Sequence, residues 1–485
     1  MKSALVVAAA LIACSMPVSA AGHPRLFVLS DIGNEPDDQM LLVRLLLYAN
    51  EIDIEGFAAT TSTWQRTRVS PGIALGVIDG YAQVLARLRE NAHGWPTADA
   101  LRARVVAGVA GYGLEAIAPD RPAAASLALL DAARRDDPRP LWITLWGGAN
   151  TLAEALARAR KTLSPQDFAA LIARLRVYSI SDQDDAGPWI RREFPGLFYI
   201  VSPSAPDRSD YARATWTGIS GDRFYRNAQG VDFTTVTNEW LDANIRQGPL
   251  GPHYPRFLFI MEGDTPSFLG LIPNGLEPGD HPGWGGWGGR YLLRQPYGET
   301  RPIWTQGGDS FGRVTSADTI GAVTSDQATI WRWREAIQND FAARIGWSIL
   351  PYVKANHPPR VTLTRDHGAG LVTEIAVQAG QPFPLDASGS RDPDGNRLSY
   401  RWLAYAEAGY EGGHFGPAPV TIAGAARARA TLTATATCTP NWLKKGDCPA
   451  TGRAHVILTV TDNGKPALMR YRRIILTVTS SQAGK

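Results

Sequence analysis

The chain is poor in cysteine, in long apolar runs and in net charge. Three cysteines in 485 residues are too few to build a cysteine-ligated metal site from neighbouring ligands. A formal net charge of +3 is close to neutral for this length, so nothing indicates nucleic acid or an anionic membrane as a partner. What is present is an ordinary globular composition, with 44% hydrophobic and 20% charged residues, long enough for two or three domains.

The apolar run at Ala4–Ala13 is too short to span a bilayer permanently. It is followed by Val18-Ser19-Ala20, which fits a signal-peptidase site. We therefore expect residues 1–20 to be a signal peptide and the mature protein to be periplasmic or extracellular. The residues ending at Cys14 also resemble a lipoprotein signal, so a lipid anchor on that cysteine is the alternative.

Cys438 and Cys448 are the remaining cysteines. In an exported protein, two such residues are most simply a disulfide that closes a small loop, and the alternative is two free thiols.

Residues 25–50 organise the rest of the sequence. Leu26–Leu29 is typical of a strand buried on both faces, and Met40–Leu47 predicts a helix with a broad buried face. Between them lie four acidic residues, Asp31, Glu35, Asp37 and Asp38. Capping of the helix explains one or two of these acids, but their number, in the crevice at the carboxyl end of a strand, favours a metal or polyol site.

The spacing of Asp31 and the Asp37-Asp38 pair resembles the aspartate-rich motif of the nucleoside hydrolases, which holds a calcium ion and sugar hydroxyls. The longer strings NEPDDQMLLVRLLLYAN and DIEGFAATTSTW are similar to a bacterial branch described as cellulose-binding proteins with a nucleoside-hydrolase-like domain. The resemblance covers most of residues 24–355 and implies an open, mostly parallel α/β sheet with flanking helices.

The resemblance also implies roles for single residues. Asp31, Asp38 and Asp264 would bind calcium, and Asp37 would hold sugar hydroxyls. Asn150, in the stretch GGANTLA, would add a backbone carbonyl to the calcium shell. The superfamily has a further aspartate, which helps to activate water, two residues after the first, whereas this chain has Gly33 there. Asp31 or Glu35 would then activate the water.

Further candidates follow the predicted strands. Trp64 follows the predicted strand 53–60, where it either lines the crevice or packs as an ordinary loop residue. Asp184 and Asp185 follow the predicted strand 176–180, where they either contact the sugar or cap a helix. The expected strands are 26–29, 53–60, 139–145, 176–180 and 255–261, and the expected helices are 72–92, 124–135, 151–161, 189–193, 233–246 and 325–346.

Residues 280–291 contain glycines around two tryptophans and predict a loop. Trp284 and Trp287 would stack on sugars and Arg290 would hold hydroxyls or a carboxylate, unless the tryptophans pack inward as anchors. His281 is a candidate proton donor to a leaving group, although a lone loop histidine is more often structural.

The prolines at 358–359 introduce a change to short strands separated by turns. Residues 386–402, DASGSRDPDGNRLSYRW, resemble bacterial extracellular immunoglobulin-like modules. We therefore expect a nucleoside-hydrolase-like domain over 22–355 and a β-sandwich over 356–485.

Two functions remain open. The first is a calcium-dependent hydrolase of an N- or O-glycosyl bond in an extracellular saccharide or glycoside, for example one derived from a plant polysaccharide. The second is a non-catalytic carbohydrate-binding protein on the same fold, without the acid that Gly33 replaces.

Overall fold

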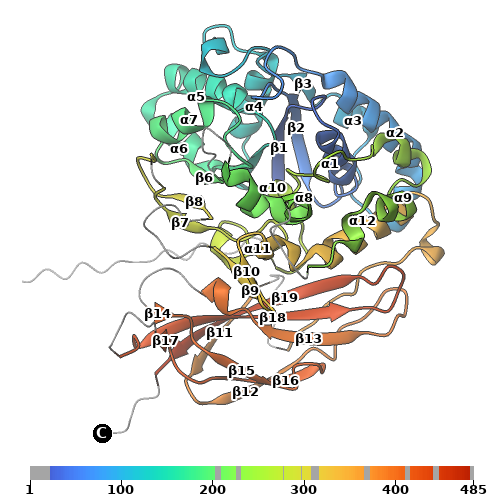
Figure 1. Cartoon of the computed structure of the whole chain (residues 1–485), viewed down its shortest axis with the longest axis vertical. Helices are drawn as coiled ribbons and strands as arrows, with labels where there is room; N and C mark the ends of the chain where they lie inside the picture. Colours follow the sequence, from blue (N-terminus) through green and yellow to red (C-terminus); the bar gives the residue numbers. More distant parts are fainter. Residues whose placement is uncertain are drawn as a thin grey trace, which may run out of the picture.

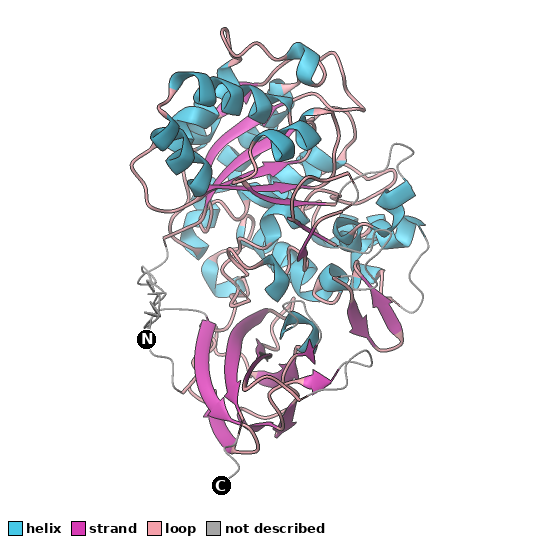
Figure 2. Cartoon of the chain, turned by 90° about the vertical axis from the view of Figure 1, so that its left-hand side faces the viewer, coloured by secondary structure: helices cyan, strands magenta, loops and turns pink. Residues whose placement is uncertain are grey.

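The computed structural model describes residues 22–202, 209–225, 231–276, 278–296, 298–306, 316–364, 372–409, 415–440 and 447–480. The expected signal peptide and Cys14 lie outside these residues. Figure 1 shows an upper body of helices around a sheet and a lower body of strands, and the quarter turn in Figure 2 shows the same two bodies stacked along the long axis.

The upper body is built on an eight-stranded sheet that is parallel except for its last pair. In spatial order its strands are β3 (Val105–Ala107), β2 (Asp53–Ala59), β1 (Arg25–Ser30), β4 (Leu141–Leu145), β5 (Leu175–Ser179), β6 (Phe198–Val201), β8 (Ile303–Thr305) and β7 (Leu292–Arg294).

Helices cover both faces of this sheet, and strand β1 shows why. Its side chains alternate between two buried apolar clusters: Leu26 and Val28 belong to one, and Phe27 and Leu29 to the other. The helices of the upper body are α1 (Asp37–Leu46), α2 (Pro71–Asn91), α3 (Ala98–Arg102), α4 (Ala124–Arg134), α5 (Asn150–Thr162), α6 (Pro165–Arg174), α7 (Ala186–Glu193), α8 (Gly221–Tyr225), α9 (Asn238–Asn244), α10 (Pro266–Leu269), α11 (Ala328–Trp331) and α12 (Arg334–Trp347).

The lower body is a strand-rich sandwich. One sheet has the order β11 (Val372–Gln378), β19 (Met469–Thr479), β18 (Thr451–Thr461) and β13 (Ser399–Ala404), and the other has β12 (Pro382–Asp386), β16 (Arg429–Ala434) and β15 (Val420–Ala423). Two short antiparallel pairs complete the strands: β14 (Phe415–Gly416) with β17 (Thr439–Pro440), and β9 (Asp318–Ile320) with β10 (Val323–Ser325), which precede the sandwich in the chain. These sheets confirm the predicted fold class of both parts.

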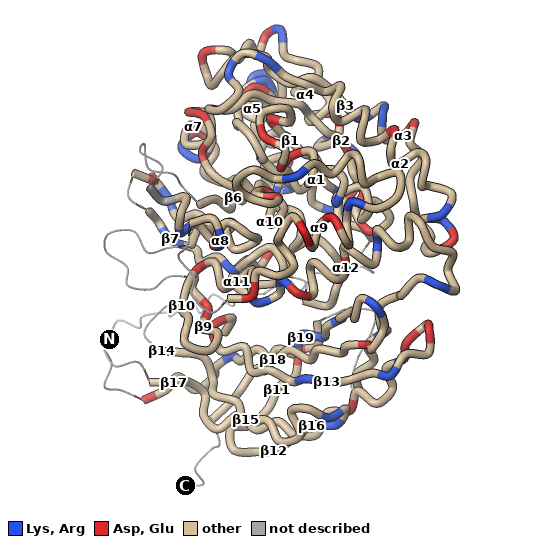
Figure 3. Tube along the Cα trace, turned by 45° about the vertical axis from the view of Figure 1, so that its right-hand side comes forward, with Lys and Arg blue, Asp and Glu red and all other residues tan. Residues whose placement is uncertain are grey.

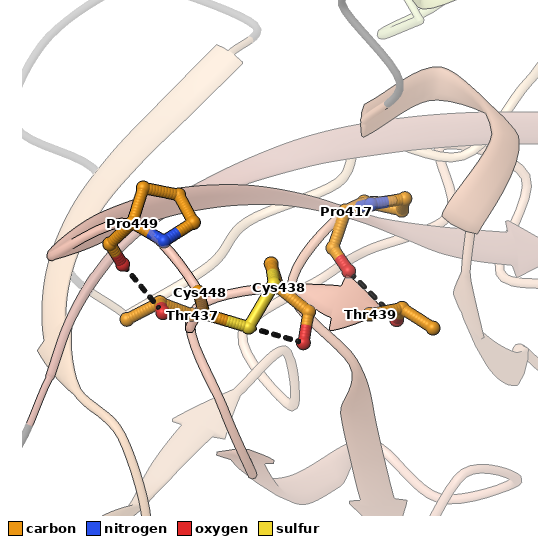
Figure 4. The surroundings of a disulfide bond; sticks show 6 residues. All are labelled: Pro417, Thr437, Cys438, Thr439, Cys448 and Pro449. Atoms are coloured by element: carbon orange, nitrogen blue, oxygen red, sulfur yellow. Dashed lines mark hydrogen bonds between the residues drawn. A yellow bond between two sulfur atoms is a disulfide. The ribbon is translucent and has the colours of Figure 1, made fainter. Parts of the chain in front are cut away.

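Cys438 and Cys448 form a disulfide in the sandwich, as predicted. Figure 4 shows that two threonines beside the bridge donate hydrogen bonds to proline carbonyls: Thr437 Oγ1 to Pro449 at 2.7 Å and Thr439 Oγ1 to Pro417 at 2.9 Å. The bridge therefore closes a loop whose ends are also fastened by hydrogen bonds.

The predicted strand at 255–261 is wrong, and the reason is local. Backbone carbonyls of Tyr254 and Pro255 accept hydrogen bonds from the guanidinium of Arg246, at 2.9 and 2.8 Å, instead of joining a sheet. Leu258 and Phe259 point into solvent, so the apolar run is not buried on both sides. The helix expected at 325–346 exists as α11 and α12, interrupted between them.

The two bodies share packing and hydrogen bonds. Tyr405 and Tyr471 of the lower body belong to the same buried apolar cluster as α1 and α12. Arg473 in β19 is fully buried and donates to the carbonyls of Leu276 at 2.8 Å and Gly285 at 2.7 Å. Asp and Glu, and Lys and Arg, are distributed over both bodies (Figure 3).

Candidate functional site

Strand β1 occupies the point at which the order of the sheet reverses. From β1 the chain moves through β2 and β3 to one side and through β4, β5 and β6 to the other. In open parallel sheets, ligands bind outside the carboxyl ends of the strands at such a reversal. The acidic residues that follow β1 lie at this position.

Two buried carboxylates at this edge are held by serine hydroxyls. Ser30 Oγ donates to Asp38 Oδ1 at 2.5 Å, and Ser62 Oγ donates to Asp31 Oδ2 at 2.5 Å. Asp37 and Asp38 form the first turn of α1, where the helix dipole favours negative charge. The segments after β1 and β2 therefore orient Asp31 and Asp38 together.

A third segment brings Asp264 to the same place. Arg44 in α1 donates to both carboxylate oxygens of Glu262, at 2.5 Å from Nε and 3.0 Å from Nη2, and both side chains are completely buried. Glu262 has a positive φ of 55°, uncommon outside glycine, which turns the chain into Gly263 and Asp264. This ion pair fastens the Asp264 segment onto the helix that carries Asp37 and Asp38.

Electrostatics show that these acids form one cluster, which we call the acidic cluster: Asp31, Asp37, Asp38 and Asp264. Burial raises the pKa of Asp264 well above its usual value, and the charges of Asp37, Asp38 and Asp31 raise it further. Burial raises the pKa of Asp31 to about 6, and burial together with Glu35 and Asp31 raises the pKa of Asp37 to about 7. Burial and the charges of Asp31 and Asp37 raise the pKa of Asp38 well above its usual value.

Such a cluster is stable only if protons or a cation compensate the charge. Buried carboxylate oxygens are the donors that calcium prefers, so the chemistry of the acidic cluster fits a hard cation. The distances between the carboxylates are not those of a metal site: among the described residues, no three Asp, Glu, His or Cys side chains are arranged to hold a metal ion. Burial and the charge of Asp31 instead raise the pKa of Asp38, so that Asp38 tends to keep its proton when no cation is bound.

Gly33 cannot easily carry the aspartate of the nucleoside hydrolases. Its φ is +104°, and an added Cβ would lie 3.0 Å from Ile73 Cδ1 and from Ser70 Oγ. Arg68 holds its carbonyl oxygen at 3.0 Å. Glu35 is half-buried and its pKa is raised by burial, so it supplies a carboxylate near this turn from a different position.

The turn between β4 and α5 is packed against the acidic cluster. A Cβ on Gly147 would lie 2.9 Å from the backbone nitrogen of Asp31, and one on Gly148 would lie 2.5 Å from Asp184 Oδ2. Glycine is therefore required for this close approach. Asp184 accepts from the backbone N–H groups of Asn150 and Ala186, both at 3.0 Å, so it fastens the starts of α5 and α7.

The structure gives Asn150 a different contact from the predicted one. It is the first residue of α5, so its carbonyl belongs to the helix hydrogen-bond ladder instead of facing the acids. Its side chain donates to the carbonyl of Gly111 at 2.7 Å and to Thr61 Oγ1 at 3.2 Å. Asp185 is exposed and accepts from the backbone N–H of Leu114 at 2.8 Å, which positions a neighbouring loop.

Trp64 lies at the outer side of the cluster. Its backbone N–H donates to Ser62 Oγ at 3.0 Å, the same hydroxyl that holds Asp31. Its indole is about half exposed. Ser62 thus links the backbone of Trp64 to Asp31, while the indole of Trp64 is open to solvent.

The glycine- and tryptophan-rich loop lies between the two bodies, which corrects the expectation that it contacts sugar. Trp287 is 1% exposed and packs edge-on against Tyr471. Arg290 is also buried and donates to Asp318 Oδ1 at 2.9 Å. The loop folds inward because its indole rings and this ion pair fill the seam against the sandwich.

The other two residues of this loop follow the same pattern. His281 stacks on Trp284 with ring centroids 4.1 Å apart, and Trp284 packs edge-on against His455 of β18. His281 is therefore at the seam between the bodies, and its predicted role as a proton donor at the acidic cluster has no support in these contacts.

Sequence reasoning did not identify Ser30, Ser62, Tyr225 or the Arg44–Glu262 pair. Ser30 and Ser62 orient the carboxylates, but isolated serines carry no pattern. The pKa of Tyr225 is raised by burial, by Tyr211 and by the charge of Glu35, which places its phenol near that carboxylate. The Arg44–Glu262 pair joins residues 218 positions apart. The one indication of it in the sequence is Arg44 itself, a charged residue within the apolar face of a helix.

Comparison with known proteins agrees with this architecture. Residues 25–291 match the family described as "Cellulose-binding Sde182, nucleoside hydrolase-like domain", and residues 382–478 match "Cellulose-binding protein Sde0182, C-terminal domain". No curated protein matches the chain.

Among solved structures, a nucleoside hydrolase-related hypothetical protein from Saccharophagus degradans, titled as associated with carbohydrate metabolism, is 33% identical. The match covers 94% of this chain and 100% of that chain, with a TM-score of 0.76. The type III effector XopQ, complexed with adenosine diphosphate ribose, is 11% identical over 68% of this chain and 95% of that chain, with a TM-score of 0.33.

None of the helices in the described part of the chain has the length and apolar character needed to cross a membrane. The chain belongs to the Sde182 family of cellulose-binding proteins with a nucleoside-hydrolase-like domain.

Proposed function

We propose that the protein binds an extracellular saccharide through the acidic cluster. The observation that carries the proposal is the convergence of Asp31, Asp37, Asp38 and Asp264 on one buried site at the reversal of the sheet. Carboxylates accept hydrogen bonds from adjacent sugar hydroxyls, and two or more of them can select a diol. The family description and the carbohydrate-related title of the Saccharophagus degradans protein support a polysaccharide as the source.

Calcium is part of the proposal. Asp31, Asp38 and Asp264 would hold it, and the bound ion would offer further coordination to the sugar oxygens. The ion would also remove the repulsion that raises the pKa of each carboxyl group. Export of the protein, by cleavage near Ala21 or as a lipoprotein on Cys14, belongs to the same proposal. Mass spectrometry of the mature N-terminus distinguishes these two routes.

One observation favours a second function, hydrolysis of a glycosyl bond. Asp31 is buried, and in the cation-free protein burial raises its pKa to about 6, close to the value that suits a general base at neutral pH. Asp31 or Glu35 would remove a proton from water as the water oxygen bonds to the anomeric carbon. The bond to the leaving group would break with its electron pair. With His281 at the seam between the bodies, the leaving group would take its proton from solvent.

The test uses the full-length mature chain with cellobiose, cellohexaose and a nucleoside panel, in calcium and in chelator. Calorimetry measures binding, and chromatography measures released sugar or base. Binding that needs Asp38, with no product, supports a carbohydrate-binding protein, whereas product that disappears in Asp38→Asn supports the hydrolase. Absence of both binding and product with every probe contradicts the proposed function.

A further inference from the structure

Phe224 and Phe259 meet on the surface where the predicted strand at 255–261 is replaced by an irregular segment, and exposed Leu258 precedes Phe259 in the chain. Phe224 is 47% exposed, Leu258 73% and Phe259 51%. The rings of Phe224 and Phe259 are 5.7 Å apart between centroids and nearly perpendicular, at 81°. Single exposed apolar residues are common on protein surfaces, but a cluster of aromatic rings usually marks a binding surface.

The aromatic patch, Phe224, Leu258 and Phe259, is joined to the acidic cluster by the short stretch from Ile260 to Asp264. Ile260 follows Phe259 and packs against two glycines. A Cβ added to Gly221 would lie 3.3 Å from Ile260 Cδ1, and a Cβ added to Gly263 would lie 3.8 Å from Ile260 Cγ2. The same Cβ at Gly263 would lie 3.4 Å from Asp37 Oδ2. A short stretch of chain therefore connects the patch to the carboxylates.

A second connection runs through α8. Tyr225 follows Phe224 directly and packs against it edge-on, with ring centroids 5.1 Å apart. Burial, Tyr211 and the charge of Glu35 raise the pKa of Tyr225, so its phenol is near the carboxylate of Glu35. The side chains thus change from acidic to aromatic along the path from Glu35 through Tyr225 to Phe224.

Sugar rings match this change in surface character. Their hydroxyl edges bind carboxylates, and their C–H faces pack on aromatic rings. We propose that Phe224, Leu258 and Phe259 form an accessory subsite that holds the next pyranose rings of a β-linked glucan whose end occupies the acidic cluster. The perpendicular rings suit a single twisted chain better than the flat face of a crystal. The inference rests on the proposed saccharide binding and adds a preference for longer chains.

The test measures the affinity of full-length protein for cellobiose and for cellohexaose. The wild-type chain should bind cellohexaose about tenfold more tightly, which is the effect of one or two stacking contacts. The double variant Phe224→Ala/Phe259→Ala should lose that advantage and keep its affinity for cellobiose. Val353→Ala removes an equally apolar, 88% exposed side chain outside the patch and should change neither affinity.

The outcomes are distinct. Length dependence that survives in the double variant, that is absent from the wild-type chain, or that is lost equally in Val353→Ala overturns the subsite. A patch that instead serves a protein partner would give the first or second of these results. Failure of the wild-type chain to bind either sugar contradicts the proposed function itself, and the subsite with it.

Discussion

Arg44 and Glu262 form a completely buried ion pair, 2.5 Å between Nε and Oε2, that joins the first helix to the segment carrying Asp264. Glu262 also accepts from Thr265 Oγ1 at 2.8 Å and from the hydroxyl of Tyr254. Arg44 donates to Gln338 Oε1 at 2.6 Å. The pair therefore positions two acidic segments that are distant in sequence.

Arg44→Met should destabilise the fold by about 3–5 kcal/mol, because Glu262 would remain buried without its partner. The double variant Arg44→Met/Glu262→Gln should recover part of this loss, since no charge is left unpaired. Denaturant unfolding of the wild-type chain, both single variants and the double variant gives the coupling energy. A coupling near zero would mean that the pair does not hold the segments together.

Asp264→Asn should stabilise the protein in cation-free buffer by about 1–2 kcal/mol at pH 8. The carboxyl groups of the acidic cluster have folded-state pKa values above their ordinary value of 3.8. The folded chain therefore holds protons that the unfolded chain loses, and the free energy of unfolding falls as pH rises from about 4 through 7. Denaturation at pH 5 and pH 8 checks this, and a larger gain at pH 5 contradicts it.

Gly33→Asp should not restore a nucleoside-hydrolase site. The positive φ and the nearby Ile73 and Ser70 predict a loss of about 1–3 kcal/mol in stability and no gain in hydrolysis. Gly33→Ala is the matched control, because it introduces the same strain without a carboxylate. Thermal unfolding and product release are measured on both variants, and hydrolysis that rises only in Gly33→Asp refutes the expectation.

His455 should make the seam between the bodies sensitive to acid. Burial and the charges of Arg473 and Arg453 lower its pKa well below the ordinary value of 6.5. As pH falls, His455 is protonated in the unfolded chain before it is protonated in the folded chain. The free energy of unfolding is therefore highest above pH 6.5 and decreases below it, by up to about 1.4 kcal/mol per pH unit.

The control for this effect is His455→Asn, which keeps an acceptor for Arg473 Nη1 but does not titrate. Its unfolding free energy should depend less on pH between 6.5 and 5 than that of the wild-type chain. Parallel pH profiles for the two proteins would show that His455 does not titrate on unfolding.

The regular parts of the upper sheet were predictable from sequence, because apolar runs such as Leu26–Leu29 are buried on both faces and end in acidic loops. The placement of Asp31 and Asp38 followed from the rule that ligands bind at the carboxyl ends of parallel strands. The placement of Asp264 followed from the resemblance alone, because the described residues directly before it form no strand. The run at 255–261 failed because apolar content does not distinguish a buried strand from an exposed patch.

The tryptophan loop was misassigned for a different reason. Trp284, Trp287 and Arg290 have the residue types of a sugar site, but the two tryptophans pack against His455 and Tyr471 of the sandwich. Arg290 is bound by Asp318. Packing between two domains depends on which faces meet, and a local pattern of residues does not contain that information. Ser30 and Ser62 were missed on the same grounds, since their role depends on the register of two strands.

Calorimetric titration of calcium into the wild-type chain and into Asp264→Asn at pH 8 tests most directly whether carboxylates from separate segments share one cation. The account predicts a single site in the wild-type chain and at least a tenfold loss of affinity in the variant, with proton release on binding. No calcium uptake by the wild-type chain, or equal affinity in both proteins, would contradict it.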